Sequence, residues 1–267
     1  MFRVSTQKGR RCGGLFVELC KFIEWKGREL TSAAKLFLLI LGVGAVAAAQ
    51  RPVSPSTDYV AQVRAARSWE YGPFANFGFG VGDRSSFKFL ALGFQAAKPL
   101  TPVLHAGILS GQFELGANIM PFWQAYTPGP HEQAYTCVDP TTELPYTCIL
   151  PVGGGTYTGS SFTPVIFRWN FLTQSKRFQP WFHGAGGLIY TTHKFPPDVL
   201  LTHGLPGGTS VFNFSPQGGI GFHYFVRPRR SIDLAVNAVH ISSASLGDRN
   251  PGVNASIQIQ GGYTYWK

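Results

Sequence analysis

Charged side chains are scarce in this sequence: Asp, Glu, Lys and Arg make up only 13% of its 267 residues. A chain so poor in the charged residues that favour helices is not expected to be mainly helical. It instead contains 32 Gly, and 14% of its residues are aromatic. These residue types suit strands, sharp turns and membrane interfaces, so the composition favours an all-β protein.

Long clusters of positive charge are also missing from most of the chain. Residues 1–50 hold eight Lys or Arg and three Glu, and therefore carry half of the net charge of +10. No long run of Lys and Arg follows residue 50, which argues against nucleic acid as a partner. A modest positive charge suits an anionic lipid surface equally well.

No apolar run long enough for a membrane-spanning helix follows residue 50. The apolar segment 34–50 follows basic residues and ends in Ala47-Ala48-Ala49, a small-residue cleavage site. We therefore expect residues 1–49 to be a signal peptide with an extended n-region, although an uncleaved anchor remains an alternative. Residues 50–57 are expected to be a linker, and residues 58–267 could enter a membrane only as a β-barrel.

Cysteine is rare, with four in the chain. Cys12 and Cys20 belong to the expected signal peptide, whereas Cys137 and Cys148 lie in a segment rich in Pro, Thr and Gly. In an oxidising compartment this second pair is expected to form a disulfide, with two free thiols as the alternative. The pair lacks CxxC spacing, and the histidines share no metal-ligand spacing, so we expect no metal site and no cofactor.

Strand-length segments separated by turn residues fill the rest of the chain. Apolar and polar residues alternate most clearly in 112–123, 211–224 and 231–242. Less regular segments of the same kind are 59–71, 74–82 or 85–98, 161–173, 179–192 and 254–266. The pattern therefore predicts about eight strands.

Alternation alone does not distinguish a soluble sandwich from a membrane barrel. The polar set is too rich in Gln, Glu, Asn, Asp, Ser and His for a dry core, and aromatic residues gather at strand ends. Both features predict an eight-stranded antiparallel transmembrane β-barrel. The connection 127–156 is long and those at 172–180 and 226–231 are short, so we expect the long connection on the outer side and the short turns in the periplasm.

A histidine and a serine end one of the clearest strands. Ile232, Leu234, Val236 and Ala238 occupy even positions, and His240 and Ser242 continue that series. Strand alternation then places both on the lipid-facing side of a barrel, near its outer rim. Two interpretations follow: polar groups beyond the apolar layer, or a base and a nucleophile acting on a lipid ester.

The segment "HISSASLGDRNPGVN" (240–254) resembles the lipid A 3-O-deacylase family of outer-membrane barrels, which shows His-x-Ser-Asn-Ala before its final strand. The resemblance implies that Ser242 is the nucleophile and His240 the general base. It assigns the oxyanion position to Ser243, where the family has Asn, and the imidazole-orienting position to Asn254, where the family has an acid. Asp248 is the nearby alternative carboxylate.

The predicted protein is therefore a bacterial outer-membrane esterase that removes the 3-O-linked acyl chain from lipid A. Its expected partner is lipopolysaccharide of the outer leaflet. Two alternatives remain: a barrel of the same architecture with a structural or adhesive role, and a soluble β-barrel that binds lipid inside. The sequence leaves the oligomeric state open, a homodimer included.

Overall fold

The computed structural model describes residues 58–201, 204–244, 246–247, 252 and 254–267. The expected signal peptide (1–49) and linker (50–57) lie outside these residues.

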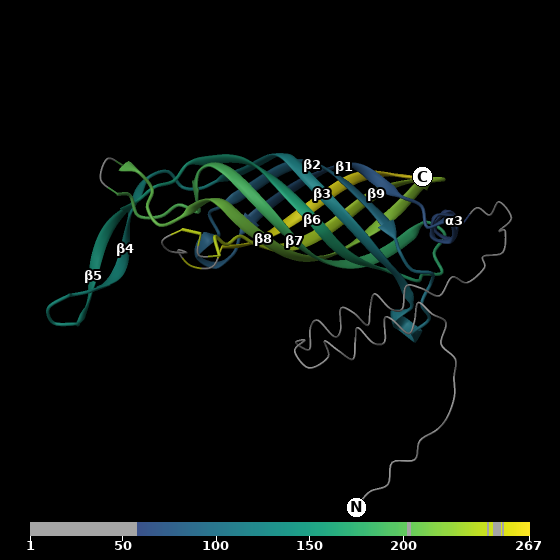
Figure 1. Cartoon of the computed structure of the whole chain (residues 1–267), viewed down its shortest axis with the longest axis horizontal. Coiled ribbons are helices and arrows are strands. Elements are labelled where there is room, and N and C mark those ends of the chain that lie inside the picture. Colours follow the sequence, from purple (N-terminus) through teal and green to yellow (C-terminus); the bar gives the residue numbers. More distant parts are fainter. Residues whose placement is uncertain (1–57, 202–203, 245, 248–251, 253) are drawn as a thin grey trace, which may run out of the picture. The chain divides into compact units, whose positions relative to one another are not determined.

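Eight antiparallel strands close into a barrel in the order β1-β10-β9-β8-β7-β6-β3-β2 (Figure 1). This confirms the fold predicted from the sequence. The strands are β1 (Glu70–Gly80), β2 (Lys88–Pro99), β3 (Gly111–Tyr126), β6 (Thr156–Phe171), β7 (Phe178–Phe195), β8 (Ser210–Arg227), β9 (Arg230–His240) and β10 (Ala255–Trp266). The short 3-10 helices η1 (Gly82–Arg84) and η2 (Gly107–Leu109) lie in the connections on either side of β2.

The first expected strand, at 59–71, is wrong over most of its length. Residues Tyr59–Ala66 form helix α3, and both segments that were alternatives, 74–82 and 85–98, contribute strands. The Asp58 side chain accepts a hydrogen bond from the Ala61 N–H at 2.8 Å and so caps the helix. Val60 and Val63, one turn apart, pack on Phe225 and Trp266, and this helix lies at the same end of the barrel as β10's last residues.

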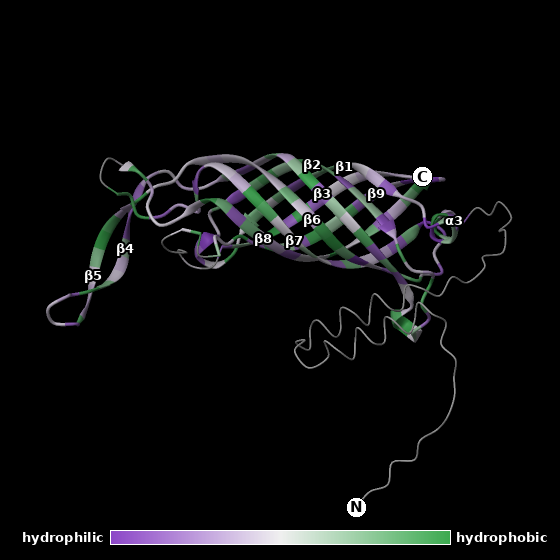
Figure 2. Ribbon diagram, in the orientation of Figure 1, coloured by the Kyte–Doolittle hydropathy of each residue, from purple (hydrophilic) through white to green (hydrophobic). Residues whose placement is uncertain are grey.

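The two faces of the barrel wall differ as the alternation predicts. In β9 every second residue is buried and the others are exposed, apart from the half-buried last residue, and Figure 2 shows hydrophobic and hydrophilic residues alternating along the strands. The exposed set is apolar and includes Phe77, Phe94, Ile220, Leu234 and Ile259. Such an outward apolar band is the surface that a bilayer covers. None of the described helices combines the length and the apolar character that spanning a bilayer requires.

Packed side chains fill the interior near the end where β3 and β6 connect. The buried cluster there comprises Phe74, Phe87, Phe89, Ala91, Met120, Trp123, Ala125, Tyr157, Ile189, Phe195, Val239 and Ile241. Trp123 belongs to the apolar residues that alternate with polar ones in 112–123, and the alternation would place it outward, but it is only 2% exposed. The register of β3 against β6 shifts between Met120 and Trp123, and this irregularity turns the indole inward.

The opposite half of the interior contains buried charges. Arg168 Nη1 lies 2.5 Å from Glu70 Oε1 and 2.6 Å from Glu114 Oε1. Asn170 donates a hydrogen bond to the second oxygen of Glu114 at 2.7 Å. One guanidinium therefore pairs with two carboxylates, all of them away from solvent.

The long connection 127–156, which was expected as a loop, contains a second, two-stranded sheet. Strands β4 (His131–Val138) and β5 (Pro145–Val152) form a hairpin at the end of the barrel opposite to α3 (Figure 1). Cys137 and Cys148 are joined by a disulfide across it. The end with this hairpin is called the hairpin end below, and the end with α3 is called the helix end.

Candidate functional site

His240 is the last residue of β9, at the hairpin end of the barrel. The side chains of Ile232, Leu234 and Val236 on the same strand are exposed, at 45%, 44% and 47%. His240 continues this outward series and is half-buried. The structure therefore places the imidazole on the apolar outer wall, as the alternation predicts.

Ser242 lies beyond the end of β9 but keeps the pairing of that strand with β8. Its backbone N–H donates to the Phe214 carbonyl at 3.0 Å, and the Phe214 N–H donates to the Ser242 carbonyl at 2.7 Å. Because this bridge continues the ladder, Ser242 is two positions from His240 on the same face, about 6.5 Å away between Cα atoms. Both residues are half-buried.

A tight bend follows Ser242. The Ser242 Oγ accepts a hydrogen bond from the Ala244 N–H at 3.2 Å, and Ala244 has a φ of 45°. Residues other than Gly adopt this left-handed conformation at a cost of about 1–2 kcal/mol. Strain of this kind often accompanies functional positions, and here it lies two residues after the candidate nucleophile.

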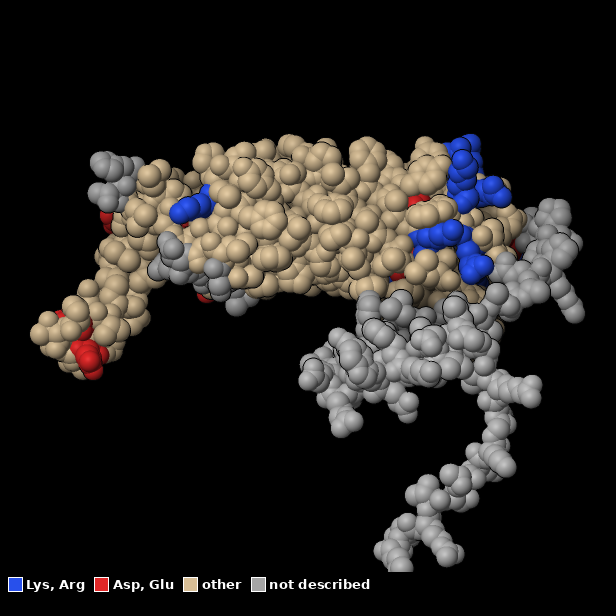
Figure 3. Space-filling model, in the orientation of Figure 1, with Lys and Arg blue, Asp and Glu red and all other residues tan. Residues whose placement is uncertain are grey.

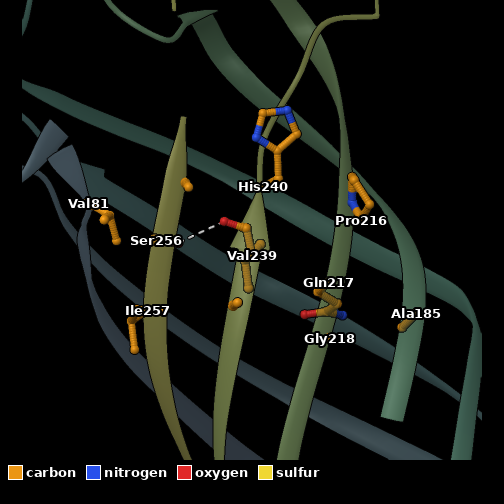
Figure 4. Close-up of a pocket in the computed structure, with 11 residues that line it drawn as sticks. Val81, Ala185, Pro216, Gln217, Gly218, Val239, His240, Ser256 and Ile257 are labelled. Carbon is orange, nitrogen blue, oxygen red and sulfur yellow. Dashed lines mark hydrogen bonds between the residues drawn. The ribbon is translucent and has the colours of Figure 1, made fainter. Parts of the chain in front are cut away.

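Beside His240 the outer wall carries a groove of about 500 Å³ that spans β7 to β10 (Figure 4). Figure 4 shows His240 at the end of its strand, with Pro216 and Gly218 on one neighbouring strand and Ser256 and Ile257 on the other. Because Gln217 opposes Val239 and Phe214 opposes Ser242, Pro216 lies opposite His240. On the other side Ala255 opposes His240.

The middle of the groove is open because the outward positions there have small side chains or none. Gly218 opposes Gly184 on one side and Ala238 on the other. A Cβ added at Gly184 would meet nothing within 4 Å, and one added at Gly218 would meet only the His183 carbonyl oxygen, at 3.5 Å. This bare strip lies one outward residue along the strands from His240, and it is wide enough for an extended hydrocarbon chain, since each strand adds about 4.8 Å.

The sequence reasoning missed this groove. Its residues come from strands far apart in the chain, and only the register places Gly218 beside Ala238. The signal was present as Gly and Ala at outward positions, where the rest of the wall has large apolar residues.

The inner face of the same segment is firmly packed. Val239 and Ile241 alternate with the two outward residues and are 6% and 1% exposed, within the aromatic cluster that contains Trp123 and Phe195. The rings of Trp123 and Phe195 meet edge to face, with centroids 5.5 Å apart. This packing holds the end of β9 from behind, which fixes the backbone that carries His240 and Ser242.

The other two expected site residues are not on the outer face. Ser243 is 1% exposed and Asn254 is 5% exposed. The Asn254 carbonyl accepts from the Ile241 N–H at 2.8 Å, so Asn254 lies opposite Ile241, an inward residue, and not opposite His240. Its side-chain amide donates to the Gly252 carbonyl at 3.4 Å. The structure therefore brings His240 and Ser242 together but separates both from the side chains of Ser243 and Asn254.

The alternative carboxylate, Asp248, lies outside the described residues. Within the part of the chain that the structure describes, no three His, Cys, Asp or Glu side chains group as a metal site.

Comparison with known proteins gives one family match. The family model described as "Lipid A 3-O-deacylase (PagL)" matches residues 111–263, more than half of the chain. This range includes the groove strands β7 to β9 and most of β10. No curated protein sequence shows significant similarity to the chain.

Several solved structures of low sequence identity are similar. Neisserial surface protein A is 13% identical with a TM-score of 0.42, covering 74% of this chain and 96% of its own. The outer membrane enzyme PagL is 13% identical with a TM-score of 0.41, covering 73% and 98%. The outer membrane protein OprG from Pseudomonas aeruginosa is 11% identical with a TM-score of 0.36, covering 75% and 95%.

Proposed function

This chain belongs to the lipid A 3-O-deacylase family, and we propose on that premise that Ser242 and His240 hydrolyse the 3-O-linked acyl ester of lipid A. The protein is a β-barrel of the bacterial outer membrane. The reaction then takes place on the outside of the barrel wall, where the substrate already lies in the bilayer.

One observation carries the proposal: His240 and Ser242 share the apolar outer face, and His240 lines a groove whose middle, at Gly218 and Ala238, has no large side chain. An imidazole and a hydroxyl on a lipid-facing wall cost free energy, because hydrocarbon offers polar groups no hydrogen bonds. Their presence there therefore favours a functional role. The neighbouring groove is a binding site for an acyl chain, and a chain bound there has its ester close to these two residues.

The chemistry follows from these two groups. The Ser242 Oγ attacks the carbonyl carbon of the ester while the imidazole of His240 accepts the hydroxyl proton. The imidazolium then returns the proton to the departing sugar oxygen, and an acyl-serine remains. Water, deprotonated in turn by His240, attacks the acyl-serine, so the products are a free fatty acid and lipid A with a free 3-hydroxyl group.

For Ser243 and Asn254 we propose roles other than those that the resemblance implies. Their side chains are buried, so we propose that they act through the backbone. The Asn254 carbonyl holds the Ile241 N–H at 2.8 Å and thereby fixes the start of β10 beside the candidate dyad. The Ser243 carbonyl accepts a hydrogen bond from the Leu246 N–H at 2.9 Å, in the bend that follows Ser242, so both residues are positioning residues in this proposal.

Lipid A from cells that express the full chain tests the proposal. We expect the mass of lipid A to fall by one 3-O-linked acyl chain, and we expect Ser242→Ala and His240→Ala to abolish this change. Ser160→Ala is the matched control, because Ser160 is an exposed serine on β6 at the same end of the barrel. Resistance of the membrane-inserted barrel to protease reports that each variant is folded.

The burial of Ser243 and Asn254 favours a second candidate, a barrel of this family without catalysis. That candidate predicts unchanged lipid A with the folded wild-type protein in the outer membrane. Unaltered deacylation by Ser242→Ala would instead show that another residue is the nucleophile.

A further inference from the structure

Exposed positive charge gathers at the helix end of the barrel. Figure 3 shows Lys and Arg concentrated there and Asp and Glu at the tip of the β4–β5 hairpin. This cationic rim consists of Arg67, Lys98, Lys176, Arg177, Arg227, Arg229, Arg230 and Lys267, of which Lys98 is half-buried and the others are exposed.

Acidic side chains do not balance this charge. Among the described residues at the helix end, Glu70, Glu114 and Asp233 are at most 3% exposed and lie inside the barrel. Asp58 is half-buried and caps α3. Among the residues that the structure describes, the helix end therefore has eight cations in the rim and no fully exposed Asp or Glu side chain.

Exposed aromatic rings of the barrel wall contact two cations of the rim. The Lys98 ammonium lies 5.1 Å from the ring of Trp69, and the Arg230 guanidinium lies 4.5 Å from the ring of Tyr265. Trp69 is 51% exposed and Tyr265 is 37% exposed. Exposed Trp and Tyr rings of a barrel lie at the boundary between hydrocarbon and headgroups, so the cations beside them reach the headgroup layer.

Two of the arginines occupy backbone positions that favour Gly. Arg67 ends α3 with a φ of 46°, and Arg229 has a φ of 58° in the two-residue turn between β8 and β9. Gly is the usual residue at both kinds of position because it adopts positive φ without a steric penalty. Both positions have Arg and not Gly despite the conformational cost of a positive φ, which points to a function for the guanidinium.

We propose that the cationic rim binds the anionic headgroups of phospholipids in the periplasmic leaflet. Two of the three connections at the helix end, 172–177 and 228–229, are short, whereas the hairpin end has the longest connection, 127–155. This is the arrangement of periplasmic and outer ends in such barrels. Lys and Arg form charge-assisted hydrogen bonds with phosphate oxygens, and a negatively charged leaflet attracts such cations. Bound headgroups hold the barrel at a constant depth and tilt, independently of any reaction at the hairpin end.

Spin-labelled lipids measure this preference directly. The full barrel is placed in phosphatidylcholine bilayers with trace spin-labelled phosphatidylglycerol or phosphatidylcholine of the same chain length. We expect the protein-associated fraction to favour phosphatidylglycerol severalfold at low salt, and the preference to vanish near 1 M NaCl, where the screening length is about 3 Å.

The double variant Arg67→Gly/Arg229→Gly separates binding from folding. We expect at least about a twofold loss of the phosphatidylglycerol preference, together with an equal or higher urea midpoint of unfolding because Gly relieves the positive φ. Lys88→Ala/Lys194→Ala removes the same charge from exposed positions at the hairpin end and serves as the matched control.

Three results would overturn the proposal. They are equal association of both lipids with the wild-type barrel, an unchanged preference in the double variant, and an equal loss of preference in the control variant. None of these depends on hydrolysis of lipid A.

Discussion

Filling the outer groove at Gly218 is expected to lower hydrolysis without unfolding the barrel. A Leu at this position has room, because its Cβ would meet only the His183 carbonyl oxygen, at an ordinary 3.5 Å. The rest of the side chain would lie on the outer wall between Gly184 and Ala238. It would occupy part of the roughly 500 Å³ in which we place the acyl chain.

The size of the expected change in kcat and KM depends on which interactions the acyl chain loses. A chain pushed out of the groove enters lipid and not water, so the familiar cost of about 0.8 kcal/mol for each exposed methylene does not arise. We therefore expect KM to change by less than about threefold. The ester, however, moves away from Ser242, and a displacement of about 1 Å can lower the rate about 100-fold, or about 2.7 kcal/mol in the activation barrier.

Initial rates on lipid A in mixed micelles, measured against the surface fraction of substrate, separate kcat from KM. Gly261→Leu is the matched control: its Cβ would meet only the Leu234 Cδ2, at 3.9 Å. Gly261 is six residues along β10 from Ala255, the partner of His240, and is therefore about 20 Å from the site. Equal kcat in the Gly218→Leu and Gly261→Leu proteins would refute the assignment of the groove as the acyl-chain site. A change in KM alone in Gly218→Leu would also refute it.

Two further changes test other parts of the structure. Asn254→Ala is expected to change kcat by less than about threefold, because the amide shares the inward face with Ile241; a 100-fold loss in a folded protein would place that amide beside His240 instead. Arg168→Met is expected to destabilise the barrel by about 3–5 kcal/mol, because Glu70 and Glu114 would remain buried without their shared cation. Urea unfolding followed by tryptophan fluorescence measures this loss of stability. Adding Glu70→Gln and Glu114→Gln should recover much of the lost stability. A wild-type urea midpoint for Arg168→Met alone would disprove the role of the ion cluster.

Much of the wall could be predicted from the sequence because strand alternation is a local property. A period of two assigns each side chain to one face, whatever strand lies beside it. Ile232 to Ser242 followed that rule, and so the outward positions of His240 and Ser242 were predictable. Trp123 was not, because a bulge in β3 reverses the faces, and bulges have no reliable signal in the local pattern.

Local pattern also misjudged the segment before β1. The irregular alternation in residues Tyr59–Ala66 suggested a strand. These residues instead form a helix that is capped by Asp58 and has two valines on one side. The deciding interaction is the contact of Val60 and Val63 with Phe225 and Trp266, whose positions depend on barrel closure. Tertiary packing therefore decided between two local conformations.

The sequence by itself determined which residues face lipid in the regular parts of the strands, where the short turns lie, and that a histidine and a serine lie on one face. Each of these depends on neighbours within a few positions along the chain. Only the tertiary structure decided that Gly218 and Ala238 leave a groove beside His240, and that Asn254 lies opposite Ile241. Those relations depend on the register between strands, which barrel closure sets through contacts among residues far apart in the sequence.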